Sequence, residues 1–507
     1  MRRIIKQLPR ALPLPKVVVP PTQALRSVTS KSGLGIYASS DRLFRGAVFG
    51  RDSLEVAEDL LYIKPKLVEK ILLTLSSLQG EKQNKDNEEE PGKIIHEYRT
   101  PEVDGKPINK ISMDIYERLA TIWGGNENCL AYYGAVDSTP HFIKVLAAYC
   151  QAYGMEILAE EVVLRSGQVK SVLSVMDDAI EWLVSTVSSS RSGLLEYHRK
   201  NPHGIENQVW KDSNEFYIHE DGKMASHSHP ISSIEIQGLT YDAFKHAAEL
   251  LPSKKTVLDT HAEKIQKRTI ELLWQPRRNY FALGTDYDDQ NNLRVITTIT
   301  ANPAELLDSL FFEELPLEDK KEFVSGIVRE IMGTDFLTDA GIRSRALSEA
   351  RLVHFWDYHG SYVTWPKETY DIAKGLRRQG FSALSRELEN RLLNVIRAIR
   401  SYPEFIYVDP RGRILGIPSS SKSHGELVLV DSNNRPERVQ AWTVSAILAI
   451  QNHRRRLSSR HTHQEPWQAE LEKEVLQHIP LVHRMRFSRE LSARYPAYPY
   501  EINNEEK

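Results

Sequence analysis

The sequence has few cysteines, modest glycine and proline, no excess of either charge and no long hydrophobic run. Its two cysteines, Cys129 and Cys150, are too few for a disulfide framework or a four-thiolate zinc site. We therefore expect a reduced compartment. Glycine (26 residues) and proline (25 residues) make up about 10% of the chain. This share disfavours a turn-rich all-β protein. No stretch reaches the ~18 apolar residues that a membrane-spanning helix needs.

The charges balance almost completely over the 507 residues, because 66 Lys and Arg oppose 68 Asp and Glu. Such a chain has no positive field to hold a polyanion, so we do not expect a nucleic-acid partner. A hydrophobic share of 41% with a net charge of -2 excludes general disorder. Pro9, Pro13 and Pro15 interrupt the basic N-terminus, which lacks the apolar core of a signal peptide. We expect a cytoplasmic protein with no membrane partner.

Hydrophobic residues recur at helical spacing along most of the chain. Val172, Val175, Ala179 and Leu183, for example, share one face of a predicted helix. Strand-like alternation is confined to short pieces near 294–299 and 405–407. The composition and periodicity thus predict an all-α protein of roughly a dozen helices. The other helices are expected near 52–63, 68–75, 111–122, 142–153, 241–251, 257–274, 317–332, 367–379, 384–396 and 437–451.

Three regions that differ in amino-acid composition suggest the domain organisation. Residues 1–30 carry prolines at positions 9, 13, 15, 20 and 21, which predict an extended arm. Residues 31–455 form the helical domain. Residues 456–507 are expected to be a charged helix near 466–478 and a tail, packed on that domain. The longest loops of the domain are rich in aromatic and polar residues, which is typical of a ligand site on a rigid frame. They are 80–110, 189–233, 333–366 and 400–436.

Common cofactor and nucleophile motifs are absent from the sequence. It contains no phosphate-binding glycine loop, no dinucleotide fingerprint and no nucleophile elbow. Two histidine pairs, His227 with His229 and His461 with His463, lie in polar segments. We interpret them as exposed loop residues and not as metal ligands. The sequence therefore predicts no cofactor and no metal.

Two carboxylates lie beside aromatic residues in predicted loops. Asp212 follows Trp210 and Lys211, and Glu404 lies between a proline and Phe405. Glycoside hydrolysis uses two carboxyl groups, one of which must stay protonated. An apolar neighbour raises the pKa of a carboxyl and keeps it protonated. Spacing alone leaves a second possibility open, in which each acid is a helix cap or a surface residue.

Nine short blocks decide between these possibilities. In order and content they resemble the bacterial amylo-α-1,6-glucosidases, which are glycogen-debranching glycoside hydrolases, and their relatives. The blocks are Phe49–Ser53, Glu89–Glu97, Tyr132–Pro140, Asn207–Ser213, Glu235–Gly238, Tyr358–His359, Trp365–Pro366, Pro403–Glu404 and Gln440–Trp442. The resemblance spans residues 49–442, which is most of the chain.

The resemblance implies an (α/α)6 barrel, a toroid of six helical hairpins with short β pieces in the loops at the active-site end. It implies an exo-acting, inverting α-glucosidase that releases glucose from α-glucans, short oligosaccharides or small α-glucosides. Asp212 is then the general acid and Glu404 the general base. The expected substrate-binding residues are Phe49, Arg51, Asp52, Glu97, Tyr133, Asp137, Trp210, Lys211, Gln237, His359, Trp365 and Trp442.

Several of these residues have a purely structural alternative. Asp52 and Asp137 each precede a predicted helix and could be N-terminal caps. Glu97 follows the acidic run 88–90 and could belong to a solvated loop. Trp442 lies on an amphipathic helix and could be a core residue.

The sequence also departs from the family pattern. Between His359 and Trp365 it is one residue longer, and Lys367 and Glu368 stand where the family has His and Asp. The β-sandwich that often precedes the barrel has no room before residue 49. A small glycoside is therefore as plausible a substrate as glycogen. Two other functions stay open: a phosphorolytic enzyme with an anion site at Arg411 and Arg413, and a non-catalytic sugar-binding protein.

Overall fold

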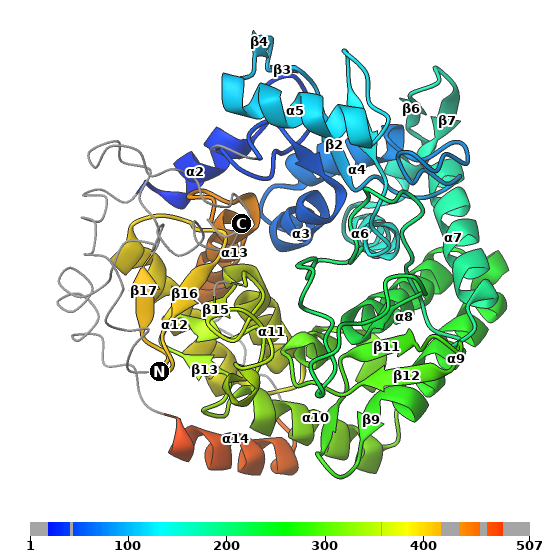
Figure 1. The fold of residues 1–507 in the computed structure, drawn as a ribbon. Helices are drawn as coiled ribbons and strands as arrows, with labels where there is room; N and C mark the ends of the chain where they lie inside the picture. Colours follow the sequence, from blue (N-terminus) through cyan, green and yellow to red (C-terminus); the bar gives the residue numbers. More distant parts are fainter. Residues whose placement is uncertain (1–18, 41–43, 356, 417–435, 457–463, 480–507) are drawn as a thin grey trace.

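Two concentric rings of helices make up most of the computed structural model (Figure 1). It describes residues 19–40, 44–355, 357–416, 436–456 and 464–479. Each inner segment packs on the next, and the last packs on the first, so the ring closes. The inner ring consists of α3 (Gly50–Leu60), α6 (Ser138–Tyr153), α8 (Ile234–Leu250), the 3-10 helix η3 (Asn302–Asp308), α11 (Pro366–Arg378) and α13 (Ala441–Arg456).

Each inner segment has an outer partner. The outer helices show a one-sided apolar stripe: on α9 the buried residues are Leu258, Ala262, Ile265, Thr269 and Leu273. The sixth pair joins the two ends of the barrel chain, because α2 packs on α13. In order of their inner partners, the outer helices are α4 (Pro65–Ser77), α7 (Val172–Ser189), α9 (Lys255–Leu273), α10 (Leu317–Ile331), α12 (Ser382–Ile399) and α2 (Pro21–Val28). The predicted all-α (α/α)6 barrel is confirmed.

One local prediction was wrong, and one inner segment was missed. Residues 21–28 form helix α2 and are not extended, because Pro21 occupies the first helical turn, where a missing N–H costs nothing. Ala24, Leu25 and Val28 of this helix are buried. The inner segment η3 was not expected at all. It is short and begins with Asn302 and Pro303, so it has no helical periodicity to detect.

Short antiparallel sheets mark one end of the barrel. In three of them a strand runs directly, or through a single residue, into an inner helix: β1 (Val48–Phe49) into α3, β8 (Ser232–Ser233) into α8 and β15 (Val363–Thr364) into α11. These sheets therefore lie at the N-terminal ends of the inner helices. Their other strands are β2 (Glu97–Arg99), β5 (Leu130–Tyr132), β11 (Gly284–Tyr287), β12 (Leu293–Ile296), β16 (Ile406–Val408) and β17 (Ile414–Gly416).

The remaining elements decorate the rings. Helix α14 (Pro466–His478) starts with a capping box between Glu465 and Gln468 and packs on α10 and α12. This confirms the helix predicted near 466–478. Among the described residues, none of the helices is long and apolar enough to span a membrane. The other elements are β3 (Glu102–Val103), β4 (Lys106–Pro107), α5 (Lys110–Ile122), η1 (Glu156–Ala159), β6 (Glu161–Val163), β7 (Val169–Ser171), η2 (Pro252–Lys254), β9 (Trp274–Gln275), β10 (Tyr280–Phe281), η4 (Leu310–Phe312), β13 (Leu337–Thr338), β14 (Gly341–Ile342) and η5 (Leu347–Glu349).

Candidate active site

A cavity of about 470 Å³ opens at the sheet-bearing end of the barrel. Its walls come from the N-terminal ends of inner helices and from the loops before them. Most of the predicted site residues meet here, although they come from distant parts of the chain. Those that line the cavity are Phe49, Arg51, Asp52, Glu97, Trp210, Asp212, Trp365, Glu404 and Trp442.

Asp212 lies on the loop that precedes β8, and its side chain is held from the facing loop. The Tyr358 hydroxyl donates a hydrogen bond to Asp212 Oδ1 at 2.9 Å. Burial raises the pKa of Asp212 to about 6, although the Arg51 guanidinium and the Tyr358 hydroxyl act in the opposite direction. A carboxyl with this pKa keeps a proton into the range where a general acid is useful.

Glu404 lies just before β16 and is buried in the cavity wall. Its Oε2 accepts a hydrogen bond from the Glu437 backbone N–H at 3.1 Å. Burial raises the pKa of Glu404 well above its ordinary value, and the Glu437 carboxyl adds to this effect. Both candidate catalytic carboxyl groups therefore lie in the cavity with raised pKa values, although their loops are far apart in the sequence.

Arg51 and Asp52, at the start of α3, face different partners. Arg51 forms an ion pair with Asp137 at 2.8 Å, and Gln440 Nε2 donates to Asp52 Oδ2 at 3.0 Å. Neither aspartate side chain caps a helix. The N-cap residue of α3 is Phe49 and that of α6 is Asp137, and no side-chain cap hydrogen bond forms at either position. Burial raises the pKa of Asp52 to about 7. The capping alternatives are thus excluded.

The sheet β1–β2–β5 places Phe49 and Glu97 side by side. Phe49 pairs with Glu97 across the first two strands. Glu97 is buried and forms an ion pair with Arg99, so it is not part of a solvated loop. His96 packs edge-on against Phe49, with ring centroids 5.4 Å apart. Burial lowers the pKa of His96 well below its usual value, so this imidazole is neutral.

Aromatic rings form one side of the cavity. Trp365 lies 5.0 Å from Phe405, 5.6 Å from Trp210 and 5.8 Å from Trp442, measured between ring centroids. Trp210 Nε1 donates to Glu305 at 2.8 Å. Among the described residues, none accepts a hydrogen bond from the buried Trp442 Nε1. Trp442 therefore combines a packing face with a free donor, which a purely core role would not require.

Five predicted substrate-binding residues lie behind the cavity wall. Tyr133 donates to the Leu78 carbonyl, and Gln237 donates to the carbonyls of Leu195 and Ser233. None of the five lines the cavity, so the structure does not place them in its wall, and their predicted contact with substrate stays a prediction. The remaining three are Asp137, which holds Arg51, Lys211, which pairs with Glu368, and His359, which stacks on Trp365 at 4.8 Å.

The residues that depart from the family pattern form a buried network. Lys367 contacts Glu55 at 3.0 Å and Asp371 at 2.8 Å. Its ammonium lies 5.0 Å from the centre of the Trp210 ring. Glu368 pairs with Lys211, whose Nζ also donates to Asn302 Oδ1 at 2.8 Å. Lys367 and Glu368 therefore pack behind Trp210 and the loop that carries Asp212.

Other cavity residues were not identified from the sequence. Tyr358 and Gln440 lay inside quoted motifs but carried no assigned role. The outer wall comes from α5, with Ile115, Arg118 and Leu119, and from the segment 203–206. A short amphipathic helix gives no signal that it borders a cavity. Within the described ranges, His, Cys, Asp and Glu form no group of three that could hold a metal ion, and His461 and His463 lie outside these ranges.

The anion site required for phosphorolysis is not favoured. Asp409 accepts hydrogen bonds from the backbone N–H groups of Arg411 and Arg413, at 2.9 and 2.8 Å. The Arg413 guanidinium also pairs with Asp409, at 2.7 Å. One of the two positive charges that a phosphate would need, that of Arg413, is therefore already paired within this turn.

Neither protein-family models nor curated proteins match the chain. Solved structures do match it, and each of the three described next covers 85% of this chain. One is a wild-type glycosidase (TM-score 0.51, 10% identity, 95% of that chain covered). Another is the GH63 mannosylglycerate hydrolase from Thermus thermophilus in complex with glucose (0.55, 14%, 99%). A third is an uncharacterised conserved protein from the same organism (0.53, 13%, 100%). At these identities the likeness shows the fold. The chain has the barrel fold of solved glycosidases.

Proposed function

We propose that the protein is a glycoside hydrolase, an exo-acting and inverting α-glucosidase of the amylo-α-1,6-glucosidase type. One observation carries this proposal: Asp212 and Glu404 line the same aromatic-walled cavity, and burial raises the pKa of both. Glycoside hydrolysis needs one protonated and one ionised carboxyl group. Beyond burial, the charge of Asp212 also raises the pKa of Glu404, so the two carboxyls lose their protons in separate steps and one can be protonated while the other is ionised.

In this mechanism Asp212 donates its proton to the glycosidic oxygen as the bond to the anomeric carbon breaks. Glu404 accepts a proton from a water molecule, whose oxygen bonds to the anomeric carbon from the opposite face. The backbone N–H of Glu437 stabilises the ionised form of Glu404. The product sugar leaves with inverted configuration, and solvent restores the original protonation of the two carboxyls.

The inner end of the cavity has the groups expected of a glucose subsite. Arg51 and Asp52 provide a charged donor and an acceptor for sugar hydroxyls. Trp442 Nε1 adds a free donor. Trp365 and Phe49 offer apolar faces against which the sugar ring packs.

A second candidate substrate class is a small glycoside with an anionic aglycone. Arg118 is exposed on α5 and lines the cavity, as do Arg199 and His203 of another loop. A cavity of about 470 Å³ holds a short substrate more readily than a polymer. One of the similar structures is named a mannosylglycerate hydrolase, and glycerate carries a carboxylate. An anionic aglycone would pair with Arg118.

The test is glucose release from maltose, isomaltose, kojibiose, trehalose, glucosylglycerate and limit dextrin, with proton NMR to identify the first anomer formed. We expect β-glucose first, and losses of about 10²–10⁴-fold for Asp212→Asn and Glu404→Gln. α-Glucosyl fluoride, whose leaving group needs no proton, should restore turnover by Asp212→Asn but not by Glu404→Gln. Glucose phosphate formed only with added phosphate would instead favour phosphorolysis. Sugar binding by calorimetry without any turnover would favour a binding protein.

A further inference from the structure

A second, smaller cavity lies inside the barrel, directly below the active-site cavity. Its volume is about 80 Å³, and it runs along the barrel axis between the inner helices. Arg51 and Trp210 line both cavities, so these two side chains form the floor that separates them. We call this space the axial chamber, and it extends from Arg51 at the active-site end to Lys374 at the other.

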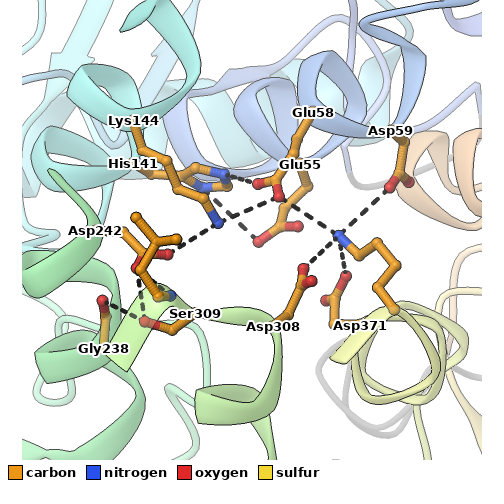
Figure 2. A network of polar contacts seen from close by, with 12 residues as sticks. Glu55, Glu58, Asp59, His141, Lys144, Gly238, Asp242, Asp308, Ser309 and Asp371 are labelled. Atoms are coloured by element: carbon orange, nitrogen blue, oxygen red, sulfur yellow. Dashed lines mark hydrogen bonds and ion pairs between the residues drawn. The ribbon is translucent and has the colours of Figure 1, made fainter. Parts of the chain in front are cut away.

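Charged side chains line the axial chamber where a barrel core would be expected to be apolar. Figure 2 shows the network at its lower end. Lys144 contacts Glu58 at 3.2 Å and Asp242 at 3.5 Å, and His141 contacts Glu58 at 3.0 Å. Carboxylates from three different segments surround the Lys374 ammonium: Asp371 at 2.9 Å, Asp308 at 3.5 Å, and Glu58 and Asp59 each at 3.7 Å. Such a wall attracts water and does not exclude it.

The lower end of the chamber lies towards the opposite face of the barrel. A third cavity, of about 600 Å³, lies there. It shares Glu58, Lys144, Asp308 and Lys374 with the axial chamber. The three cavities thus follow one another along the barrel axis, with shared residues at each junction.

Three polar atoms in the chamber wall have no hydrogen-bond partner within the described part of the chain, and they are Arg51 Nε, Asp137 Oδ1 and Glu235 Oε1. Among the described residues, none forms a hydrogen bond with Arg51 Nε or with Asp137 Oδ1. Arg51 is 7% exposed and Asp137 is 4% exposed, so bulk solvent does not satisfy them either. Water is the ligand that fits both, because it accepts from the Nε–H group and donates to the carboxylate oxygen. A chamber of about 80 Å³ is several times the roughly 10–15 Å³ that a single water needs, so it has room for more than one.

We propose that the axial chamber is a water-binding site and serves as a rear vent for the active-site cavity. A sugar that enters the cavity displaces water, and a sugar that leaves must be replaced by water. In a cavity closed at its inner end this water has to pass the sugar itself. The chamber gives it a second route, beside Arg51 and out through the opposite face. The kinetic part of this inference rests on the proposed sugar-binding function, whereas the water site does not.

The water site is tested by a high-resolution crystal structure of the full chain. We expect ordered water within hydrogen-bond distance of Arg51 Nε and Asp137 Oδ1, and further waters towards Lys374. A dry chamber, or one closed by rearranged side chains, would overturn the inference whether or not the protein cleaves sugars.

The vent is tested by blocking it. Leu239 on α8 is half-buried and lines the axial chamber, so Leu239→Trp fills part of it. Leu73→Trp, at a half-buried position of outer helix α4, is the matched control. Saturation-transfer NMR measures how fast glucose binds and leaves. In Leu239→Trp we expect both rates to fall by a common factor of about ten, with Kd unchanged. In Leu73→Trp neither rate should change.

Other outcomes separate the possible failures. Unchanged rates in a folded Leu239→Trp variant, or a change in Kd without slower exchange, would overturn the vent. If this variant fails to fold, Leu239→Phe makes the same measurement with a smaller obstruction. If wild-type protein binds no glucose, the proposed function fails, and the crystallographic water test still decides the water site.

Discussion

The Tyr358 hydroxyl donates to Asp212 Oδ1 at 2.9 Å, across a separation of 146 residues. The tyrosine lies on the loop between β14 and β15, and the aspartate lies on the loop before β8. Burial raises the pKa of Tyr358 well above its usual value, so the hydroxyl keeps its proton and stays a donor. This contact joins the two loops that carry the candidate acid and its aromatic neighbours.

The first prediction concerns this hydrogen bond. Because it favours the ionised carboxylate, its removal in Tyr358→Phe raises the pKa of Asp212 above about 6. We expect the alkaline limb of the pH profile of kcat/KM to move up by about one unit. Tyr153→Phe removes a tyrosine hydroxyl that bonds to Leu61 outside the cavity and is the control. A limb that stays in place or moves down would show that Tyr358 does not act on the acid.

The pH profile of the wild-type enzyme follows from the same carboxyl. Asp212 is active when protonated, and its pKa of about 6 lies above the ordinary value of 3.8. Activity should therefore fall about tenfold for each pH unit above about pH 6, and the acid limb of the profile should belong to Glu404, whose pKa burial also raises. Initial rates on the best substrate across the pH range measure both limbs. An alkaline limb near pH 4 would mean that Asp212 is not the acid.

Asp52 links stability to pH. Its pKa is about 7 in the folded protein, against 3.8 ordinarily, because it is buried. The folded state thus binds this proton more tightly, and the resulting stabilisation is present at low pH and lost as pH rises through about 7. Asp52→Asn cannot ionise. Its free energy of unfolding, relative to wild type, should rise by about 4 kcal/mol between about pH 4 and pH 8.

Urea unfolding at several pH values measures this difference. Asp114→Asn, at an exposed position of α5, is the control and should show no such trend. If the stability difference between Asp52→Asn and wild type is the same at both ends of the pH range, Asp52 has no raised pKa in the folded protein.

The buried pair of Lys211 and Glu368 should be costly to break. Both side chains are fully buried. Lys211→Met leaves the Glu368 carboxylate without its cation and should lower the free energy of unfolding by about 3–5 kcal/mol. The double variant Lys211→Met/Glu368→Gln removes both charges and should recover a large part of the loss. Denaturant unfolding of the two singles and the double measures the coupling.

A surface pair gives the comparison. Lys321 and Glu318 lie at 2.8 Å on α10, and the glutamate is well exposed. Lys321→Met should cost less than about 1 kcal/mol. If Lys211→Met costs no more than Lys321→Met, the buried pair does not hold the loop of Asp212.

Much of the fold could be predicted from the sequence, because most helices of the barrel show a local hydrophobic periodicity. The stripe on 172–183 predicted α7, and Gly380, at the end of the stretch predicted near 367–379, separates α11 from α12. The segment 302–308 could not be predicted in this way. It completes the inner ring because α8 and α11 pack on either side of it, and not because its own sequence favours a helix.

The candidate site, like the fold, could be predicted from the sequence only in part. Short motifs, through their resemblance to a known family, pointed to Asp212 and Glu404 and to the aromatic residues beside them. Only the tertiary structure decided that Arg51 binds Asp137, that Gln440 binds Asp52, and that Lys211 and Glu368 neutralise each other behind the wall. A motif records which residue types occur together, whereas burial and pairing depend on which distant segments pack against them. Here the closure of the barrel brings residue 440 beside residue 52 and so determines this pairing.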